Sequence, residues 1–572
     1  MRQLDGWGCR TRCRSQIISL LIDTAVPRGI TVWDWLFDSK YSSLSSHTPS
    51  SIGGYENAIT KERVSYHDVK TYSTYICTAL VNRYGLKAGD TVALFSQNTI
   101  WYPVAMFAAI RAGAMVSGAS PAYNIEEMTY ALKTGHAKFL MTSPPSMEVA
   151  TAAAAAAGIP KSNIFLLEGE LDGYTTIRDL IEIGKREPRQ TPAFKIPQGK
   201  TNFDVCGFLS FSSGTTGLPK AVMIAHQNVI AQCLQVQQIT PESHKKVLAV
   251  LPLFHITGLV HGLNLPILLN ANVYMLPSFT MKSMLDTIVE YQIAELLLVP
   301  PILIRMVRDP LVAEYDLRFL KRFSSGAAPL SEEIIQELKA RFPHTGFKQG
   351  YGMTESCSCI TAHPQTHYDY KYAHAVGTIC ASTTVKIMNE EGKECNVGEP
   401  GEILARGPQI VMGYLRNEKA TRETFDEEGY LHTGDQGFID EEGMITITDR
   451  IKEMIKVKGI GVAPAEMEDL LLGHPKVEDC AVLGVKDDYS GELPKAYVVL
   501  KPENDANDKT GKELLEFVKG RKVRHKWIKE IEFVHDIPKS ASGKILRRVL
   551  RDAKVRENGL LVKDMVTEKA RL

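Results

Sequence analysis

Short apolar runs alternate with longer segments of helical periodicity through roughly the first four hundred residues. Residues 91–94 form an apolar run of strand length, and residues 102–112 carry the small and apolar side chains of a buried helix. The alanines at 152–157 predict another helix, which Gly158 ends. Because strands that alternate with helices are typical of layered proteins, we predict an α/β fold.

The pattern changes near residue 450, where a cluster of charged residues follows an alternating strand. A chain of 572 residues exceeds the size at which one core keeps growing, so several subdomains are expected. Beyond residue 450 we predict strands at 452–457, 480–485 and 496–500 and a helix at 512–526. We divide the chain into a variable and disordered N-terminal extension, a large multi-subdomain α/β body and a smaller, mobile α+β C-terminal domain, at residues 1–28, 29–450 and 451–572.

Composition excludes several classes of function. Sixty-six basic residues balance sixty-six acidic ones, so the chain has no electrostatic footprint for nucleic acid or an anionic membrane. No apolar run is long enough to span a bilayer, and residues 296–304, interrupted by Pro300 and Pro301, predict a buried strand and a turn. The ten cysteines are scattered, which indicates reduced thiols and disfavours a sulfur-bound metal.

Both termini carry possible targeting signals. Several arginines precede an apolar patch near the N-terminus, but Asp5 and the scarcity of serine favour a disordered start over a transit peptide. The last three residues, Ala570-Arg571-Leu572, have the small-basic-leucine form of a peroxisomal address. We therefore expect recognition by a peroxisomal import receptor, with the cytoplasm as the alternative location.

A loop rich in hydroxyl groups and glycine is suited to binding a polyphosphate. It differs from a P-loop because Pro219 and Ala221 flank its lysine, where a P-loop has glycine and a hydroxyl residue. Strands at 208–211 and 222–224 flank it, so anion binding must come from hydroxyls and from backbone amides freed by glycine. The alternative is a plain surface turn. The candidate phosphate-binding residues are Ser212, Ser213, Gly214, Thr215, Thr216, Gly217 and Lys220.

A second candidate loop near the C-terminus places Lys544 between Gly543 and Ile545. Ser542 and Gly543 supply flexibility, and residues 545–550 predict a helical anchor. A solvated surface charge is the ordinary fate of such a lysine. Together the two loops predict an ATP-using enzyme whose active site is completed by its last domain.

Five motifs occur in an order that resembles the acyl-adenylate-forming superfamily, in its 4-coumarate–CoA ligase and firefly-luciferase branch. The resemblance covers about residues 30–552. The motifs are the Ser212–Lys220 loop, Gly350-Tyr351-Gly352-Met353-Thr354-Glu355, Tyr430-Leu431-His432-Thr433-Gly434-Asp435, Asp449-Arg450 and the Lys544 loop.

The resemblance implies a nucleotide site. Thr354 is expected to contact the α-phosphate and Glu355 to hold Mg²⁺, although the pair could simply start a helix. Asp435 is expected to accept hydrogen bonds from the ribose hydroxyls, with Arg450 as its partner. Small residues would let adenine approach the backbone beside the ring of Tyr351. Further AMP-binding residues expected here are Ser325, Gly326, Ala327, Gly350, Gly352 and Lys456.

The resemblance also implies an acyl pocket, a thiol tunnel and a hinge. Lys544 is expected to enter the site for adenylation and to leave it for thioester formation. Lys452 would lie at the hinge, Lys458 and Gly459 would line the thiol tunnel, and His255 would be the gate between pocket and tunnel. Gly461 departs from the family's usual glutamine. We assign to the acyl pocket Thr257, His261, Ala327 and Cys359, of which Thr257 and His261 depart from the coumarate pattern.

These features predict an acid–CoA ligase that activates an aryl or medium-chain carboxylic acid with ATP and Mg²⁺, through acyl-AMP, and passes it to coenzyme A. Three alternatives remain: an adenylating enzyme that loads a carrier protein in trans, a luciferase-like oxygenase, and a silent nucleotide-binding regulator. The basic run at 519–529 could meet the CoA phosphates, but a solvated helix face is favoured.

Overall fold

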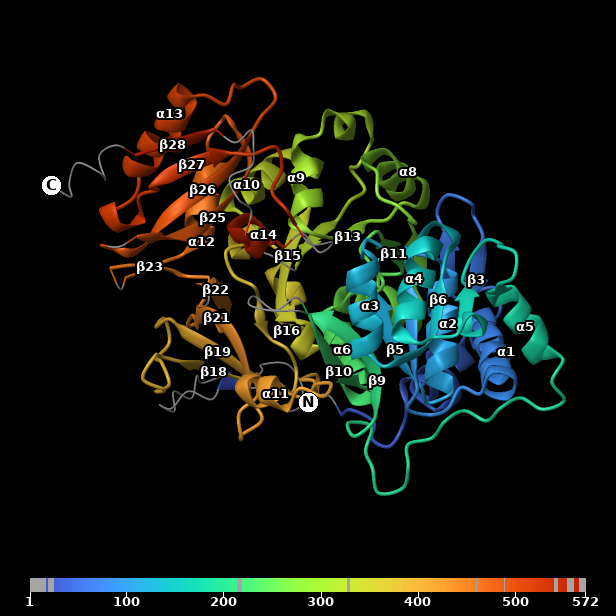
Figure 1. The fold of residues 1–572 in the computed structure, drawn as a ribbon. Helices are drawn as coiled ribbons and strands as arrows, with labels where there is room; N and C mark the ends of the chain where they lie inside the picture. The colour runs from blue at the N-terminus through green and yellow to red at the C-terminus, as the bar shows by residue number, and fades with distance from the viewer. Residues whose placement is uncertain are drawn as a thin grey trace, which may run out of the picture.

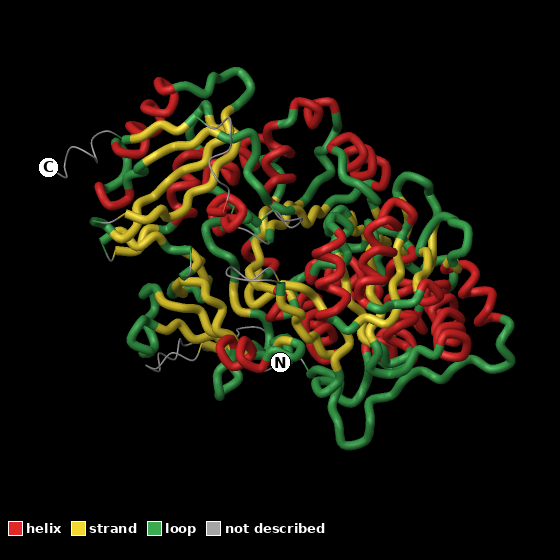
Figure 2. The backbone as a smooth tube through the Cα atoms, viewed as in Figure 1, coloured by secondary structure: helices red, strands yellow, loops and turns green. Residues whose placement is uncertain are grey.

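The computed structural model describes residues 17–18, 25–212, 219–326, 330–451, 453–458, 460–487, 489–539, 544–552 and 560–564. Figure 1 shows a large body and a smaller C-terminal domain, drawn in orange to red, beside it. Strands and helices are mixed throughout (Figure 2), so the predicted α/β body with a smaller α+β C-terminal domain is confirmed.

The first subdomain is a three-layer α/β sandwich around an eight-stranded sheet. Alternate residues of its central strand point to opposite faces: Val92 and Leu94 enter one core, and Ala93 and Phe95 enter another. One helical layer contains α1 (Tyr66–Tyr84), α2 (Trp101–Arg111), α5 (Ile177–Lys185) and α6 (His226–Gln238). The other layer contains α3 (Ile125–Thr134) and α4 (Met147–Ala157). The sheet order is β20 (Gly413–Tyr414), β10 (Lys220–Ala225), β9 (Cys206–Ser212), β5 (Met115–Ala119), β4 (Thr91–Phe95), β6 (Ala137–Thr142), β7 (Ile164–Leu166) and β8 (Thr175–Thr176).

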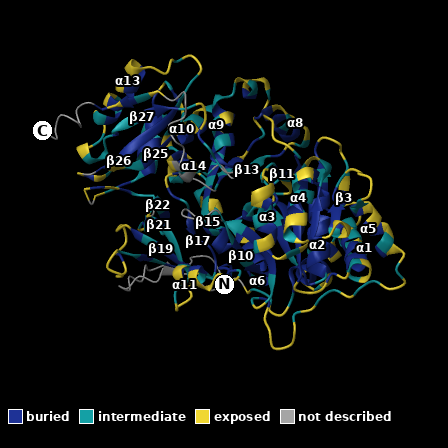
Figure 3. Cartoon of the chain, in the orientation of Figure 1, coloured by how far each residue is buried: buried dark blue, intermediate teal, exposed yellow. Residues whose placement is uncertain are grey.

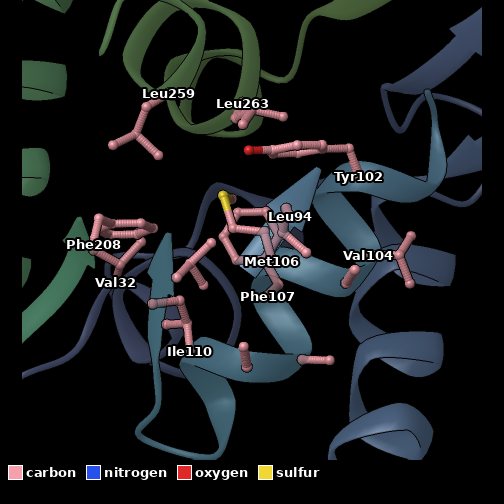
Figure 4. Packing of buried hydrophobic residues seen from close by; sticks show 14 of the residues in the cluster. Val32, Leu94, Tyr102, Val104, Met106, Phe107, Ile110, Phe208, Leu259 and Leu263 are labelled. Carbon is pink, nitrogen blue, oxygen red and sulfur yellow. The ribbon is translucent and has the colours of Figure 1, made fainter. Parts of the chain in front are cut away.

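The larger of the two cores joins α2 to an irregular helical segment that will form one wall of the site. In Figure 4, Tyr102 and Met106 of α2 lie opposite Leu259 and Leu263. The irregular segment is η5 (Gly258–Asn264), which continues into α7 (Leu265–Leu269). Burial of these apolar side chains stabilises the segment against the sandwich.

A second sheet with three helices forms the next subdomain. Its first three strands are parallel and the last two pair antiparallel, and Phe323 and Phe347 point into a core made with the helices. The helices are α8 (Met281–Tyr291), α9 (Pro300–Arg308) and α10 (Glu332–Arg341). The sheet order is β13 (Glu295–Leu298), β14 (Arg322–Ser325), β15 (Gly346–Met353), β16 (Ser358–Ala362) and β17 (Thr378–Ile379). A smaller sheet beside it contains β11 (Lys246–Ala249), β12 (Asn272–Met275), β2 (Gly54–Asn57) and β3 (Arg63–Ser65).

The chain passes from the body to the C-terminal domain between two sheets. The last sheet of the body contains β1 (Ile17–Ile18), β18 (Thr384–Met388), β19 (Gly401–Arg406), β21 (Leu431–Ile439) and β22 (Ile445–Arg450), with α11 (Glu418–Thr424) nearby. The C-terminal sheet contains β24 (Ile460–Val462), β23 (Ile455–Val457), β26 (Gly491–Leu500), β27 (Glu530–Phe533) and β28 (Leu561–Lys563), with β25 (Val477–Asp487) on β26. Its helices are α12 (Pro464–Leu472), α13 (Asp508–Lys519) and α14 (Arg547–Asp552).

Two predicted elements are corrected. The turn expected after the strand at 296 is the helix α9, because Pro300 and Pro301 occupy its first turn, where proline needs no amide partner. The helix expected at 512–526 ends at Lys519 with Gly520 as its cap, and a separate short turn covers Arg524–Lys526.

Buried residues, dark blue in Figure 3, concentrate in the sheets. Within the described ranges every helix is too short or too polar to cross a lipid bilayer. The mobility of the C-terminal domain stays a prediction, as do the three domain boundaries.

Candidate functional site

A cavity of about 1220 Å³ lies where the subdomains and the C-terminal domain meet. The ends of β9, β10, β14, β15, β21 and β22 contribute to its wall, together with η5 and the segment that leads into α14. The predicted site residues that line it are Ser212, Lys220, His255, Thr257, His261, Ser325, Gly326, Gly350, Tyr351, Gly352, Thr354, Glu355, Cys359, Asp435, Arg450 and Lys544.

Not every predicted residue lines the cavity. Lys456 is exposed and lies 3.8 Å from a carboxylate oxygen of Glu390, and the Lys458 ammonium stands over the ring of Tyr489. The thiol-tunnel and AMP roles of these two lysines stay predictions. The following predicted residues lie outside the described ones: Ser213, Gly214, Thr215, Thr216, Gly217, Ala327, Lys452, Gly459, Ala570, Arg571 and Leu572.

Thr354 and Glu355 begin a short helical turn directly after β15. Both are almost fully buried at the cavity wall. The Tyr414 hydroxyl donates a 2.8 Å hydrogen bond to Oε1 of Glu355, and the backbone amide of Val411 donates to the Glu355 carbonyl. The Glu355 carboxylate is therefore held in place with lone pairs still available.

Lys220 is connected to the same group through Tyr414. Because β20 pairs with β10, the ring of Tyr414 comes beneath the Lys220 ammonium, at 4.3 Å from the ring centroid. This cation–π contact points the lysine along the cavity wall, and the phosphate-loop strand is thereby tied to Glu355. Tyr414 was missed in the sequence because only the pairing of distant strands brings it here.

Asp435 lies at the centre of a small hydrogen-bonded group. Its partner across β21 and β22 is Arg450, whose Nε lies 3.2 Å from Oδ1. The Tyr351 hydroxyl donates to Oδ2 at 2.8 Å. Burial raises the pKa of Asp435, while Arg450, Tyr351 and Lys544 act to lower it. Each carboxylate oxygen keeps a second lone pair that a ribose hydroxyl could use.

Lys544 reaches the same end of the cavity from the C-terminal domain. Burial lowers the pKa of Lys544 to about 8, and the charge of Arg450 acts in the same direction, while Glu453 and Asp435 oppose it. The segment is anchored by Arg547, which pairs with Glu453 at 3.0 Å and with Glu468 at 2.6 Å. The cavity therefore contains a cation supplied by the second domain.

The other half of the cavity is lined by neutral imidazoles. Burial lowers the pKa of His255 to about 4 and that of His261 to about 3, so both are uncharged at neutral pH. Nε2 of His261 lies 3.3 Å from Oγ of Ser358. Two cations, Arg322 and Lys348, also line this half. Lys348 lies on the same face of β15 as Gly350, because alternate residues of a strand share a face. Its place directly before the Gln349-Gly350-Tyr351-Gly352 run was the signal that sequence reasoning missed.

The side chains present fit Mg²⁺ bound together with a nucleotide. No group of three or more His, Cys, Asp or Glu side chains able to hold a metal occurs among the described residues. Mg²⁺, however, is usually bound through one or two carboxylates, with phosphate oxygens and water as its other ligands. Glu355, a fixed carboxylate in the cavity wall, can supply that single protein ligand.

The remaining predictions concern cysteines and the basic run. The eight described cysteines are free thiols. Within the basic run, Lys522 and Lys526 both pair with Glu466, and Lys519 pairs with Asp564. Each of these lysines therefore has a carboxylate partner, although Lys522 and Lys526 share one, and contact with the CoA phosphates stays an untested alternative.

Comparison with known proteins identifies the family. The model of the AMP-binding enzyme family matches residues 54–415, and that of the AMP-binding enzyme C-terminal domain matches residues 466–544. The chain is 36% identical over 496 residues to 4-coumarate–CoA ligase 2 of Oryza sativa subsp. japonica, which covers 83% of this chain and 84% of the relative. It is 35% identical over 505 residues to 4-coumarate–CoA ligase-like 1 of Arabidopsis thaliana, covering 86% and 90%.

Solved structures agree with this result. ATP-bound MatB from Rhodopseudomonas palustris superposes with a TM-score of 0.78 at 26% identity and covers 92% of this chain and 98% of its own. The anthranilate–CoA ligase AuaEII in complex with anthranoyl-AMP, at 24% identity and a TM-score of 0.80, shares the fold over 92% of this chain and 97% of its own. The chain therefore belongs to the AMP-binding enzyme family, within its acid–CoA ligase branch.

Proposed function

We propose that the protein joins an aryl or medium-chain carboxylic acid to coenzyme A at the expense of ATP, through an acyl-AMP intermediate. The observation that carries this proposal is the convergence of Lys544, from the C-terminal domain, with Asp435 and Arg450 of the body at one end of a single cavity. Thr354 and Glu355 line the same cavity. A carboxylate needs a leaving group before a thiol can attack it, and this end of the cavity is suited to the nucleotide that provides one.

In the first step a carboxylate oxygen of the acid attacks the α-phosphorus of ATP. The new O–P bond forms as the bond to the β-phosphate oxygen breaks, and pyrophosphate leaves with the electron pair. Negative charge gathers on phosphate oxygens, where Lys544, Lys220 and the Thr354 hydroxyl can stabilise it. Mg²⁺ held by Glu355 would neutralise part of the phosphate charge.

In the second step the thiol sulfur of CoA attacks the acyl carbon. The C–S bond forms, the bond from that carbon to the AMP oxygen breaks, and the thiol proton is released to solvent. The neutral His255 and His261 place no charge beside the acyl group in this half of the cavity. We further propose that Ala570-Arg571-Leu572 directs the enzyme to peroxisomes through their import receptor.

The test is pyrophosphate release from ATP and Mg²⁺ over a panel of aryl and medium-chain acids, with and without CoA. Acid-dependent release that CoA converts into a thioester product is expected. Release with an adenylate that only a carrier protein accepts would favour the in-trans loading enzyme, and oxygen consumption with light would favour a luciferase-like activity. If the protein binds nucleotide but releases no pyrophosphate with any acid, only the nucleotide-binding regulator would remain, and the proposal would be overturned.

A further inference from the structure

Lys348 is a lysine on the wall of the acyl half of the cavity. It lies in β15, where alternate residues point to opposite faces. Phe347 points into the core with the helices, whereas Lys348 lines the cavity together with Gly350 two residues later. The neighbouring strands continue the same face, because Lys348 is in register with Ser324 of β14, which also lines the cavity.

Glu295, the carboxylate that acts electrostatically on Lys348, is already paired with other side chains. Glu295 pairs with Arg322 and accepts a 2.8 Å contact from Nδ1 of His244. Within the described part of the chain no carboxylate forms an ion pair with Lys348, although Glu295 and Arg322 both act on it electrostatically. Two cations, Lys348 and Arg322, thus face a single carboxylate.

The neighbouring strand β16 and the segment η5 do not supply a counter-charge. His261 lies close enough that Lys348 contributes to lowering its pKa, and Ser358 and Cys359 are neutral. Burial raises the pKa of the Cys359 thiol, which therefore stays protonated and uncharged. Burial lowers the pKa of Lys348 itself to about 8, so the ammonium form still predominates at neutral pH.

The direction of the strands relates Lys348 to the nucleotide end. Ser325 is the last residue of β14 and Thr354 directly follows β15, while Gly350 lies inside β15 beside Tyr351, which forms the proposed ribose site with Asp435. Lys348 stands two residues before Gly350, about 7 Å back along the strand at the usual rise per residue. An acid whose carboxylate is at the α-phosphate would therefore extend its far end toward Lys348.

We propose that the preferred acid carries a second carboxylate at the end remote from the reacting one, and that Lys348 binds this second carboxylate. The inference rests on the proposed acid–CoA ligase function and specifies its substrate class. A neutral far end would remove water from the ammonium without replacing its hydrogen bonds, whereas a carboxylate replaces them with a charge-assisted pair. Lys348 is thus a specificity-determining residue and takes no part in bond breaking.

The experiment compares matched acids on the intact enzyme. Cinnamate, 4-carboxycinnamate and the methyl ester of its ring carboxylate form one series, and hexanoate, adipate and monomethyl adipate form another. Pyrophosphate release gives kcat/KM for each acid with the unchanged enzyme and with Lys348→Met, Lys348→Arg and Lys339→Met. The last variant removes an exposed lysine of α10 and is the control.

In at least one series kcat/KM for the diacid is expected to exceed that for its ester roughly 10- to 100-fold, which is the usual effect of a hydrogen bond to a charged group. Lys348→Met should abolish that preference and raise turnover of the ester, Lys348→Arg should keep the preference, and Lys339→Met should change nothing. If Lys348 had a merely structural role, its replacement would lower kcat/KM equally for all acids and leave the diacid-to-ester ratio unchanged. That result would overturn the inference.

The two proposals fail in different ways. Efficient turnover of monocarboxylates with no preference for a diacid, and no change of ratio in Lys348→Met, overturns the inference and leaves the ligase proposal standing. No pyrophosphate release with any acid overturns both. If Lys348→Met does not fold, as judged by thermal melting, the diacid-to-ester ratio of Lys348→Arg and of the unchanged enzyme still decides.

Discussion

Replacement of Lys544 should separate the two half-reactions. The lysine lies beside Arg450 and Asp435 at the nucleotide end of the cavity, and the segment that carries it belongs to the C-terminal domain. Lys544→Met keeps the length of the side chain and removes its charge. We expect acyl-AMP formation to fall about 10²- to 10³-fold, the usual effect of losing one preorganised donor to developing negative charge. Thioester formation from supplied acyl-AMP should change little.

The pH dependence provides an independent measure of the same residue. With a pKa of about 8, Lys544 carries its proton below that pH and loses it above. About nine-tenths of the amine is charged at pH 7 and about one-tenth at pH 9. Because kcat/KM reports groups of the free enzyme, kcat/KM for ATP should fall about tenfold per pH unit above pH 8. In Lys544→Arg this fall should disappear up to pH 10, since arginine stays protonated.

The assays are pyrophosphate exchange into ATP for the first half-reaction and CoA thioester formation from synthetic acyl-AMP for the second. ATP is varied at saturating acid, so that titration of Lys348 in the acyl half does not enter the profile. Equal loss of both half-reactions in Lys544→Met would refute the two-position role of this lysine. A fall above pH 8 that persists in Lys544→Arg would show that another group titrates.

Three further predictions concern the metal, the domain and the address. Glu355→Gln keeps an oxygen for the Tyr414 hydroxyl but removes the charge, so half-saturating Mg²⁺ should rise at least about tenfold; an unchanged Mg²⁺ titration would contradict this. Arg547→Met leaves Glu453 and Glu468 buried without their cation and should destabilise the C-terminal domain by about 3–5 kcal/mol in denaturant unfolding. A loss below about 1 kcal/mol would count against that network. Deletion of Leu572 should move a tagged protein from peroxisomes to the cytosol, whereas an unchanged peroxisomal signal would exclude the address.

Local pattern was sufficient for the strands around the phosphate loop. The apolar runs at 208–211 and 222–224 lie within β9 and β10, and the alanine run at 152–157 lies within α4. These elements follow from the local sequence, because the periodicity of their apolar side chains agrees with the burial they adopt. Pro300 and Pro301 predict a turn because proline disfavours a helix interior, yet both fit the first turn of α9.

Long-range pairing explains what the sequence did not reveal. Tyr414 approaches Glu355 only because β20 joins β10 across almost two hundred residues. Lys348 becomes a cation without its own carboxylate only because Glu295, two strands away, is engaged by Arg322 and His244. The motif beside Lys348 indicates its place in the cavity, but neither of these long-range pairings leaves a periodic or compositional trace in the sequence.

Lys544 and Lys348, two of the lysines that line the cavity, have the same perturbation but different consequences. Burial is the first cause of the lowered pKa of both Lys544 and Lys348, and a neighbouring arginine acts in the same direction on each. At the nucleotide end, Asp435 partly offsets the excess charge and triphosphate offsets the rest in every catalytic cycle, whichever acid is bound. At the acyl end Glu295 is shared with Arg322 and His244, so the remaining positive charge is left for the acid to offset. A buried cation that serves catalysis at Lys544 therefore becomes a basis for selecting among acids at Lys348.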